Sequence, residues 1–493
     1  MNNHDGMISR PPIVVIMGHV DHGKTTLLDF IRKTNVAQRE AGAITQSIGA
    51  YEIVHYTHES GEGRKITFID TPGHEAFSQM RGRGARAADV AVLVVAADEG
   101  VKPQTKESLE QINATKTPFI IAFTKIDKPG SDVQRVRTQL SELGILVESW
   151  GGDIPEQEVS SLSGEGVNEL LDLILLVADL QELKANPAAK GKGIVIETKR
   201  DSKRGITASL IIQDGTIHEK DFIATPSTQG KIKLIEDFKG TRITEASFSS
   251  PVLITGFEEL PRVGEEWTCD EQQFSSHKQT VETTQHANEF LRKGKEVPEG
   301  HKLINVIIKA DTYGSYEALE TIVESLYKEG LSVQSISHGI GDITDSDIKL
   351  ADTFKAVILG FHVKVKKEWS LLVDQLKVRV ITSDIIYDTV TQFEAFLDKQ
   401  VAGEKEYLGE LEVLAWFSES KKGQLVGGKV LIGNVSTGKR IDLYRGTEKI
   451  GEGRITTLHT GKQEVKTVPQ NKECGLIVQG APRVEVGDLI KLY

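Results

Sequence analysis

The chain has 493 residues and a mass of 54.2 kDa, so it is too long for one hydrophobic core, and three or four domains are expected. The formal net charge is −12, and no run reaches the roughly 18 consecutive apolar residues that a membrane span needs, which argues against a membrane protein. The N-terminal residues show no signal or transit pattern, and the only cysteines are Cys269 and Cys474, so we expect a cytoplasmic protein without a disulfide or metal framework.

Residues 10–182 are predicted to form an α/β domain. Apolar, β-branched runs occur at residues 13–17, 66–69, 90–95 and 119–123, with 20 or more residues between successive runs. Continuous runs of this kind are typical of strands that are buried on both faces of a mostly parallel sheet.

Residues 190–280 and 405–493 are predicted to form two β-barrels. Short alternating strands replace the long apolar runs there, and Asp214-Gly215 is a strong hairpin signal. Glycine-containing segments recur at similar spacing in both stretches, which indicates a duplicated barrel.

Residues 303–400 are predicted to form an α/β domain that ends in a connecting helix. Ile386, Val390, Phe393 and Leu397 follow helical spacing, so they share one face of that helix. The predicted fold class is therefore multidomain α/β plus β: an α/β domain, a β-barrel, an α/β three-layer domain, a connecting helix and a C-terminal β-barrel.

A phosphate-loop pattern, GxxxxGK[ST], follows the first predicted strand and precedes a helical run, which is the context that this motif requires. The nucleotide-binding residues predicted here are Gly18, His19, Val20, Asp21, His22, Gly23, Lys24, Thr25 and Thr26. Backbone N–H groups of such a loop surround a β-phosphate, while Lys24 contacts the β- and γ-phosphates and Thr25 places its hydroxyl on Mg²⁺.

Three further segments at predicted strand ends select GTP over ATP. They are Asp70-Thr71-Pro72-Gly73, Thr124-Lys125-Ile126-Asp127 and Ser160-Ser161-Leu162. Asp70 is expected to reach Mg²⁺ and Gly73 to approach a γ-phosphate. Asp127 is expected to accept from the N1 and exocyclic amino groups of guanine, a donor pair that adenine lacks. With these motifs, residues 10–182 are predicted to be a P-loop GTPase domain.

On these motifs the chain resembles the translational GTPases, and within them the bacterial translation initiation factor 2 family. The resemblance covers residues 10–493 and is carried further by Gly42-Ala43-Ile44-Thr45-Gln46-Ser47-Ile48-Gly49-Ala50-Tyr51, His74-Glu75-Ala76-Phe77, Lys309-Ala310-Asp311, His338-Gly339-Ile340-Gly341 and Glu473-Cys474-Gly475. It implies a short form without the N-terminal extension domains of the family.

The resemblance also implies residue roles. Thr45 is expected to close on Mg²⁺ beside Thr25 and Asp70, and His74 to orient the attacking water. Val20 and Ile44 stand where the family has a hydrophobic gate that restrains this histidine. The alternative for His74 is a structural histidine that caps the next helix. Glu473, Cys474 and Gly475 are expected to line the pocket for the acylated end of tRNA.

The implied function is a GTP-dependent translation initiation factor. Such a protein binds formylmethionyl initiator tRNA, places it on the small ribosomal subunit, promotes subunit joining and hydrolyses GTP to GDP and phosphate on the ribosome. The implied cofactors are GTP/GDP and Mg²⁺, and the implied partners are the initiator tRNA and the ribosomal subunits, with their rRNA and proteins. A monomer that does not contact a membrane is expected.

Two other functions share the switch motifs. An elongation-type carrier of aminoacyl-tRNA usually has two consecutive barrels after the GTPase domain, and a ribosome-assembly GTPase would lack an acyl-end pocket. The chain also departs from the family pattern: Thr124 replaces the usual asparagine, Gly428 a common second cysteine, and His459-Thr460-Gly461 a basic pair with an aromatic. Residues 413–493 carry 13 Lys/Arg against 8 Asp/Glu, so this end can contact RNA although the whole chain is acidic.

Overall fold

The computed structural model describes residues 6–34, 49–57, 61–201, 203–271, 301–328, 330–401, 407–420, 423–446, 448–461 and 463–493. These residues belong to two compact units, Met1–Leu397 and Asp398–Tyr493. No helix among the described residues is long and apolar enough to cross a membrane.

The first unit contains a six-stranded sheet in the order β3-β4-β2-β5-β6-β7. Its strands are β2 (Ile13–Gly18), β3 (Gly49–Tyr56), β4 (Gly63–Asp70), β5 (Val90–Ala96), β6 (Phe119–Thr124) and β7 (Glu156–Glu158). All neighbouring pairs are parallel except β3 with β4. The carboxyl ends of β2, β4, β5 and β6 therefore meet at one edge of the sheet.

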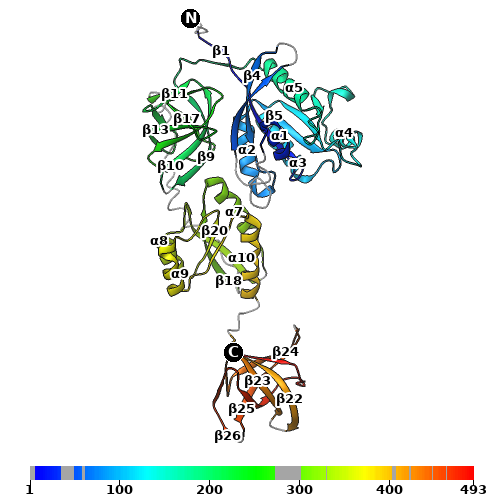
Figure 1. The fold of residues 1–493 in the computed structure, drawn as a ribbon, viewed down its shortest axis with the longest axis vertical. Coiled ribbons are helices and arrows are strands. Elements are labelled where there is room, and N and C mark those ends of the chain that lie inside the picture. Colours follow the sequence, from blue (N-terminus) through cyan, green and yellow to red (C-terminus); the bar gives the residue numbers. More distant parts are fainter. Residues whose placement is uncertain are drawn as a thin grey trace. The chain divides into compact units, whose positions relative to one another are not determined.

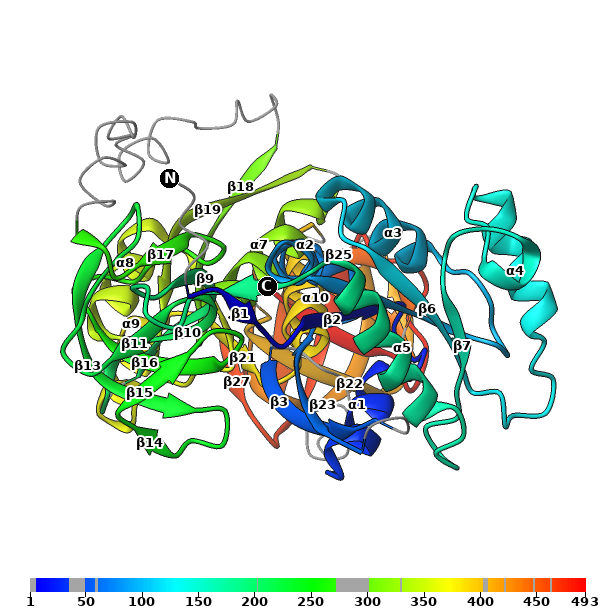
Figure 2. The ribbon, with the colours of Figure 1, turned by 90° about the horizontal axis from the view of Figure 1, so that it is seen from above.

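Helices cover both faces of this sheet, because side chains of β2 alternate between two buried clusters. The helices are α1 (Lys24–Arg32), α2 (Ser78–Ala87), α3 (Pro103–Thr115), α4 (Val133–Glu142) and α5 (Val167–Leu180), with short 3-10 turns η2 (Glu75–Phe77) and η3 (Glu148–Trp150). Ile13, Val15 and Met17 pack with residues of α2, α3 and α4, while Val14 and Ile16 pack with residues of α1 and α5. Figure 2 shows α4 beside the edge strand β7, to which Arg137 is joined by ion pairs.

A closed barrel follows in the chain (Figure 1). Its strands are β9 (Lys192–Asp201), β10 (Gly205–Asp214), β12 (Phe222–Ala224), β13 (Gln229–Asp237), β16 (Pro251–Phe257) and β17 (Glu266–Thr268). They pair in the order β12-β17-β9-β10-β16-β13, and β12 also pairs with β13, which closes the sheet. Short strands accompany these elements: β1 (Ile8–Ser9), β8 (Lys184–Ala185), β11 (Thr216–His218), β14 (Arg242–Ile243) and β15 (Glu245–Ser247).

A four-stranded parallel sheet in the order β19-β18-β20-β21 completes the first unit. Its elements are β18 (Lys302–Ala310), α7 (Tyr313–Ser325), β19 (Leu331–Ile340), α8 (Asp345–Phe354), β20 (Val357–Phe361), η4 (Lys367–Trp369), α9 (Ser370–Leu376), β21 (Val380–Ser383) and α10 (Ile386–Val401). Residues of α7 and α10 pack on one face of the sheet, and residues of α8 and α9 pack on the other. This is a three-layer α/β arrangement.

The second unit is another closed barrel. Its strands are β22 (Gly409–Ser420), β23 (Gly423–Ser436), β24 (Arg440–Arg445), β25 (Glu448–Thr460), β28 (Glu473–Gln479) and β29 (Leu489–Leu492), with short β26 (Gln463–Glu464) and β27 (Thr467–Pro469). The order β22-β29-β24-β25-β28-β23 closes through the pairing of β22 with β23. The predicted fold class is confirmed, and the division of the chain into four domains stays a prediction.

Candidate functional site

The segment between β2 and α1 has the backbone of a phosphate loop. α1 begins at Lys24, directly after Gly23, which has a φ of 86°. The Lys24 side chain is buried, and its Nζ donates to the carbonyl oxygen of His19 at 2.6 Å. Burial lowers the pKa of Lys24 to about 8, an effect that the nearby Asp70 carboxylate opposes. A phosphate group would add further negative charge beside this ammonium and raise its pKa, so the loop fits an anionic ligand.

The segment after β4 lies against this loop. A Cβ at Gly73 would come within 2.3 Å of Lys24 Nζ and 3.0 Å of the Val20 nitrogen, so a larger residue there would displace both groups. Thr71 Oγ1 donates to the Ile16 carbonyl at 2.8 Å, which ties the segment to β2. Arg81, fully buried on α2, donates to the carbonyl oxygens of Pro72 and His74. The turn is thereby held in one conformation.

Of the three residues predicted to hold Mg²⁺, Thr25 and Asp70 lie in the part of the chain that the structure describes. Thr25 is the second residue of α1, and Asp70 is the last residue of β4. Hydroxyl and carboxylate oxygens are the ligands that Mg²⁺ prefers. Arg32 Nη2 lies 3.7 Å from Asp70 Oδ2, so a cation and this guanidinium would compete for the same carboxylate. Thr45 and Ile44 lie outside the described residues.

His74 caps a short helix and also lines the same pocket as Lys24 and Gly73. Its Nδ1 accepts from the Ala76 N–H at 3.1 Å, at the start of η2. In the neutral ring the proton then resides on Nε2, which is a donor. The ring also packs edge to face on Tyr387 of α10, with centroids 4.6 Å apart. Burial lowers the pKa of His74, and Glu75 opposes this shift.

The segments after β6 and β7 meet beside the phosphate loop. Thr124 Oγ1 donates to the His22 carbonyl at 2.6 Å, so its hydroxyl braces the loop where the family has an amide. Asp127 Oδ1 accepts from the Ser160 hydroxyl at 2.6 Å, and this bond leaves the carboxylate its second oxygen for a ligand. Lys125 Nζ lies 3.1 Å from Glu99 Oε1.

One pocket of about 380 Å³ collects most of the predicted nucleotide residues. The predicted residues that line it are Val20, Asp21, Gly23, Lys24, Thr25, Thr26, Gly73, His74, Thr124, Lys125, Asp127, Ser161 and Leu162. The other predicted residues belong to the same four segments without lining the pocket: Gly18, His19, His22, Asp70, Thr71, Pro72 and Ser160.

Two lining residues were missed by sequence reasoning, Lys128 and Tyr387. Lys128 directly follows the Asp127 motif and could have been included on that ground. Tyr387 is more than 220 residues from the other lining residues in the sequence, and its neighbour Ile386 was assigned to the buried face of a helix. Only the packing of α10 brings it here.

The second unit has its own pocket of about 700 Å³, which contains the three residues predicted to contact an acyl group. Glu473, Cys474 and Gly475 begin β28, and Cys474 pairs across the strands with Gly428 of β23. A Cβ at position 428 would lie 2.3 Å from Leu411 Cδ2, so the cysteine common in the family does not fit beside this leucine.

Apolar and polar groups share the wall of that pocket. Leu414 and Phe417, both exposed, lie on one side, and His459 of β25 pairs with Gly475. Burial raises the pKa of the Cys474 thiol to about 11, so it is neutral and acts as a small apolar group near pH 7.

Three family models match successive parts of residues 9–394. The family described as Elongation factor Tu GTP binding domain matches residues 9–179, Elongation factor G domain 2 matches residues 190–269, and Translation-initiation factor 2 matches residues 276–394.

Full-length relatives match too. Translation initiation factor IF-2 from Anoxybacillus flavithermus is 40% identical over 506 residues, which is all of this chain and 69% of that protein. The Aquifex aeolicus protein of the same name is 41% identical over 98% of this chain and 61% of its own length. The crystal structure of GDP-bound aIF5B from Aeropyrum pernix is 26% identical and covers 98% of this chain and 92% of that chain, with a TM-score of 0.48.

Proposed function

The chain belongs to the translation initiation factor 2 family and is a translational GTPase, and from this premise we propose that it carries initiator tRNA to the ribosome and times its release by GTP hydrolysis. The observation that carries the GTPase part is the pocket at which the carboxyl ends of β2, β4 and β6 bring together Lys24, Gly73, His74 and Asp127. The chain spans 69% and 61% of the two relatives described above, so its substrates and partners are part of the proposal.

The residues at this site have separate tasks in the proposal. Backbone N–H groups at the start of α1 and Lys24 bind the β- and γ-phosphates, since a helix N-terminus and an ammonium both attract anions. Asp127 accepts from the two donors of guanine. Thr25, Asp70 and Thr45 hold Mg²⁺, which when bound neutralises charge on the phosphates.

His74 is the proposed catalytic residue. Because its Nδ1 accepts from Ala76, its Nε2–H is left to hold the attacking water or the γ-phosphate through a donated hydrogen bond. In this tautomer the ring positions the water and cannot take its proton. Intrinsic turnover is therefore slow, and the ribosome accelerates it by aligning the ring.

The second barrel is the proposed tRNA-binding part. Its pocket offers an apolar wall from Leu414 and Phe417 and a carboxylate from Glu473, a combination that suits a methionine side chain and its amide. An acyl end offers few phosphates, so discrimination depends on this wall. Ribosomal subunits are the proposed further partners, and the cytoplasm is the proposed location.

Binding of tRNA to the full chain tests this proposal against the two other functions. Formylmethionyl initiator tRNA should bind more tightly than deacylated initiator tRNA or an aminoacylated elongator tRNA. Phe417→Ala should weaken binding of the acylated form about tenfold, since an exposed aromatic side chain that the acyl group covers on binding contributes roughly 1.5–3 kcal/mol. Trp416→Ala, on the neighbouring position outside the pocket, is the matched control.

The salt dependence decides what kind of contact is made. Phe417→Ala should leave the slope of log affinity against log salt concentration unchanged, because that slope counts the phosphates that the protein neutralises. Equal affinity for acylated and deacylated tRNA, with a steep slope, would indicate general RNA binding. Preference for the elongator tRNA would indicate an elongation-type carrier.

A further inference from the structure

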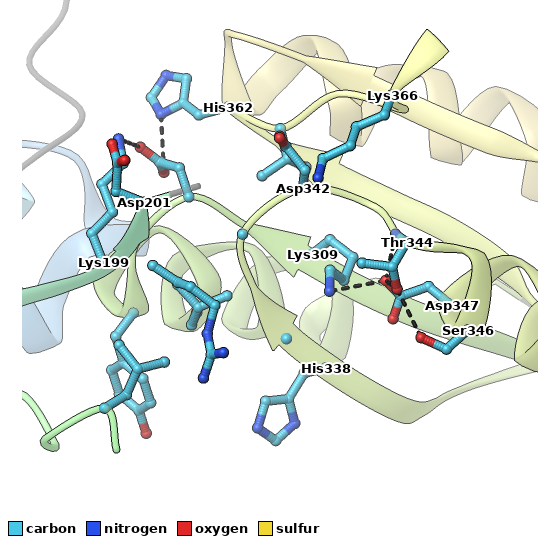
Figure 3. Close-up of a pocket in the computed structure, with 18 of the residues that line it drawn as sticks. Lys199, Asp201, Lys309, His338, Asp342, Thr344, Ser346, Asp347, His362 and Lys366 are labelled. Atoms are coloured by element: carbon cyan, nitrogen blue, oxygen red, sulfur yellow. Dashed lines mark hydrogen bonds and ion pairs between the residues drawn. The ribbon is translucent and has the colours of Figure 1, made fainter. Parts of the chain in front are cut away.

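A hollow of the first unit that remains without a role lies at the carboxyl ends of the parallel strands β18, β19 and β20 (Figure 3). β18 comes first in the chain but lies between β19 and β20 in the sheet. The next strand, β19, is on one side of β18, and the following strand, β20, is on the other side, so the direction of strand addition reverses at β18. In open parallel sheets, ligands bind in the crevice outside the strand ends at such a reversal. The volume here is about 730 Å³, within the range of small-ligand sites.

The barrel forms a second wall of this crevice. Lys199 of β9 makes an isolated antiparallel bridge with Thr312, just after β18, and its Nζ lies 3.5 Å from Asp311 Oδ2. Arg200, Asp201 and the loop that contains Arg262 also line the space. A ligand there would contact both the barrel and the α/β sheet.

Lys309 places a buried cation at the crevice. Its side chain is 8% exposed, and its Nζ lies 3.0 Å from Asp347 Oδ2. A Cβ at position 339 would come within 2.7 Å of that Nζ, so Gly339 leaves the room that the ammonium occupies. A buried ion pair contributes little to net stability, because desolvation offsets the attraction. Figure 3 shows this pair joined by a dashed line, with the Lys366 side chain above it in the view.

The exposed charges around the crevice are of a kind that binds phosphate. Arg200, Arg262 and Lys366 are exposed, and no carboxylate of the described residues lies within 4.0 Å of their charged nitrogens. Asp311 is paired with Lys199 and His362, and Asp347 is paired with Lys309. The unpaired side-chain cations are therefore left to an anionic ligand.

The remaining carboxylates suit hydroxyl donors. Asp201 Oδ1 accepts from the backbone nitrogens of Lys203 and Arg204 at 2.7 and 2.9 Å, and Asp342 Oδ1 accepts from that of Lys364 at 3.4 Å. Each carboxylate has a second oxygen with further acceptor capacity. Cations for a phosphate and carboxylates for hydroxyl groups together match a phosphorylated sugar, and Tyr313 adds an aromatic side chain to the lining.

We propose that this crevice is a second phosphate-ligand site, separate from the GTP pocket, which binds the ribose phosphate of a nucleotide. Arg200, Arg262 and Lys366 contact the phosphate, and Asp201 and Asp342 accept from the ribose hydroxyl groups. The ribose phosphate can come from a free nucleotide or from an RNA chain.

Fluorescently labelled ADP, added to the full chain in the presence of saturating GDP, tests the site. GDP fills the pocket at Lys24, and adenine lacks the donor pair that Asp127 accepts, so ADP reports on the second crevice. Saturable binding of ADP is expected, and Arg262→Glu/Lys366→Glu should weaken it at least tenfold. The control Lys231→Glu/Lys377→Glu changes the net charge equally at exposed positions outside the crevice and should leave ADP affinity unchanged.

Two results would overturn the proposal: no saturable ADP binding to the unaltered chain, or equal affinity of the two double variants. An oligouridine decamer distinguishes the two sources of the phosphate. Displacement of ADP by the decamer, at lower concentration than by unlabelled ADP, supports the site and assigns it to RNA. Displacement by unlabelled ADP alone supports the site and assigns it to a free nucleotide.

Discussion

Thr124 shows how one atom can replace a larger side chain. Thr124 is 1% exposed, and its hydroxyl donates to the carbonyl oxygen of His22, which is 102 residues away in the sequence. The sequence showed only that Thr124 stands where the family has an asparagine, because a pattern does not reveal whether a shorter donor reaches the same acceptor. At 2.6 Å the hydroxyl does reach it.

Thr124→Val removes this donor while it keeps the shape of the side chain. An unpaired buried carbonyl costs about 1–3 kcal/mol, so GDP affinity should fall roughly tenfold as the phosphate loop loses its brace. Thr124→Ser keeps the hydroxyl and should bind GDP almost as the unaltered chain does. Titration with fluorescent GDP measures both, and equal affinity of the valine and serine variants would show that the hydrogen bond has no role in binding.

At the scale of elements, the strands were the most predictable part. The predicted runs at residues 13–17, 90–95 and 119–123 each fall within β2, β5 and β6 and stop one residue short of their ends. Buried parallel strands need continuous apolar sequence, and the phosphate and guanine motifs begin where that sequence stops. Contacts between elements that are distant in sequence leave no such trace, which is why Tyr387 was missed.

The start of α10 is expected to control the ionisation of His74. Burial lowers the pKa of His74, and the Tyr387 ring is part of that burial. Tyr387→Ala exposes the imidazole, so its pKa should rise toward 6.5, the value of a solvated histidine. NMR titration of labelled histidine, assigned with a His74→Gln variant, measures the shift. Tyr327→Ala, at a position that is 75% exposed, is the control. An unchanged pKa in Tyr387→Ala would show that α10 does not cover the ring in solution.

At the scale of the whole molecule, three parts of the first unit meet at a buried carboxylate. They are the six-stranded sheet with its helices, the barrel, and the four-stranded sheet with its helices. Glu197 of β9 accepts from the backbone nitrogens of Thr198 and Gly314, at 2.9 and 3.3 Å. Beside it, Arg83 of α2 pairs with Glu317 of α7. Through α7, the helix α2, which follows the pocket residues Gly73 and His74, is thus joined to the barrel and to the α/β sheet. The sequence could not predict this junction, because an isolated glutamate in a strand is most often exposed.

The junction predicts how stability depends on pH. Burial raises the pKa of Glu197 to about 7, above its value of about 4.5 in an unfolded chain. As pH rises from 4.5 to 7, the unfolded chain loses this proton while the folded chain keeps it, so the folded state becomes less stable. Glu197→Gln cannot ionise, and its free energy of unfolding should fall less over this range. Urea unfolding at several pH values measures this.

Glu245→Gln, at an exposed position of the same barrel, is the control for that comparison and should follow the unaltered chain. Parallel profiles for Glu197→Gln and the unaltered chain would mean that Glu197 is ionised in the folded protein at pH 5.

Ribosome-stimulated GTP hydrolysis by two variants of His74 tests the central claim most directly, because the structure gives this residue both a capping and a pocket position. His74→Asn can still cap η2, since asparagine is a favoured N-cap, while His74→Ala cannot. If the imidazole positions the water, both variants should bind GTP within a few-fold of the unaltered chain and lose at least ~10²-fold in stimulated turnover. Turnover restored by asparagine, or a loss of GTP binding equal to the loss of turnover, would contradict the account and leave His74 as a structural cap.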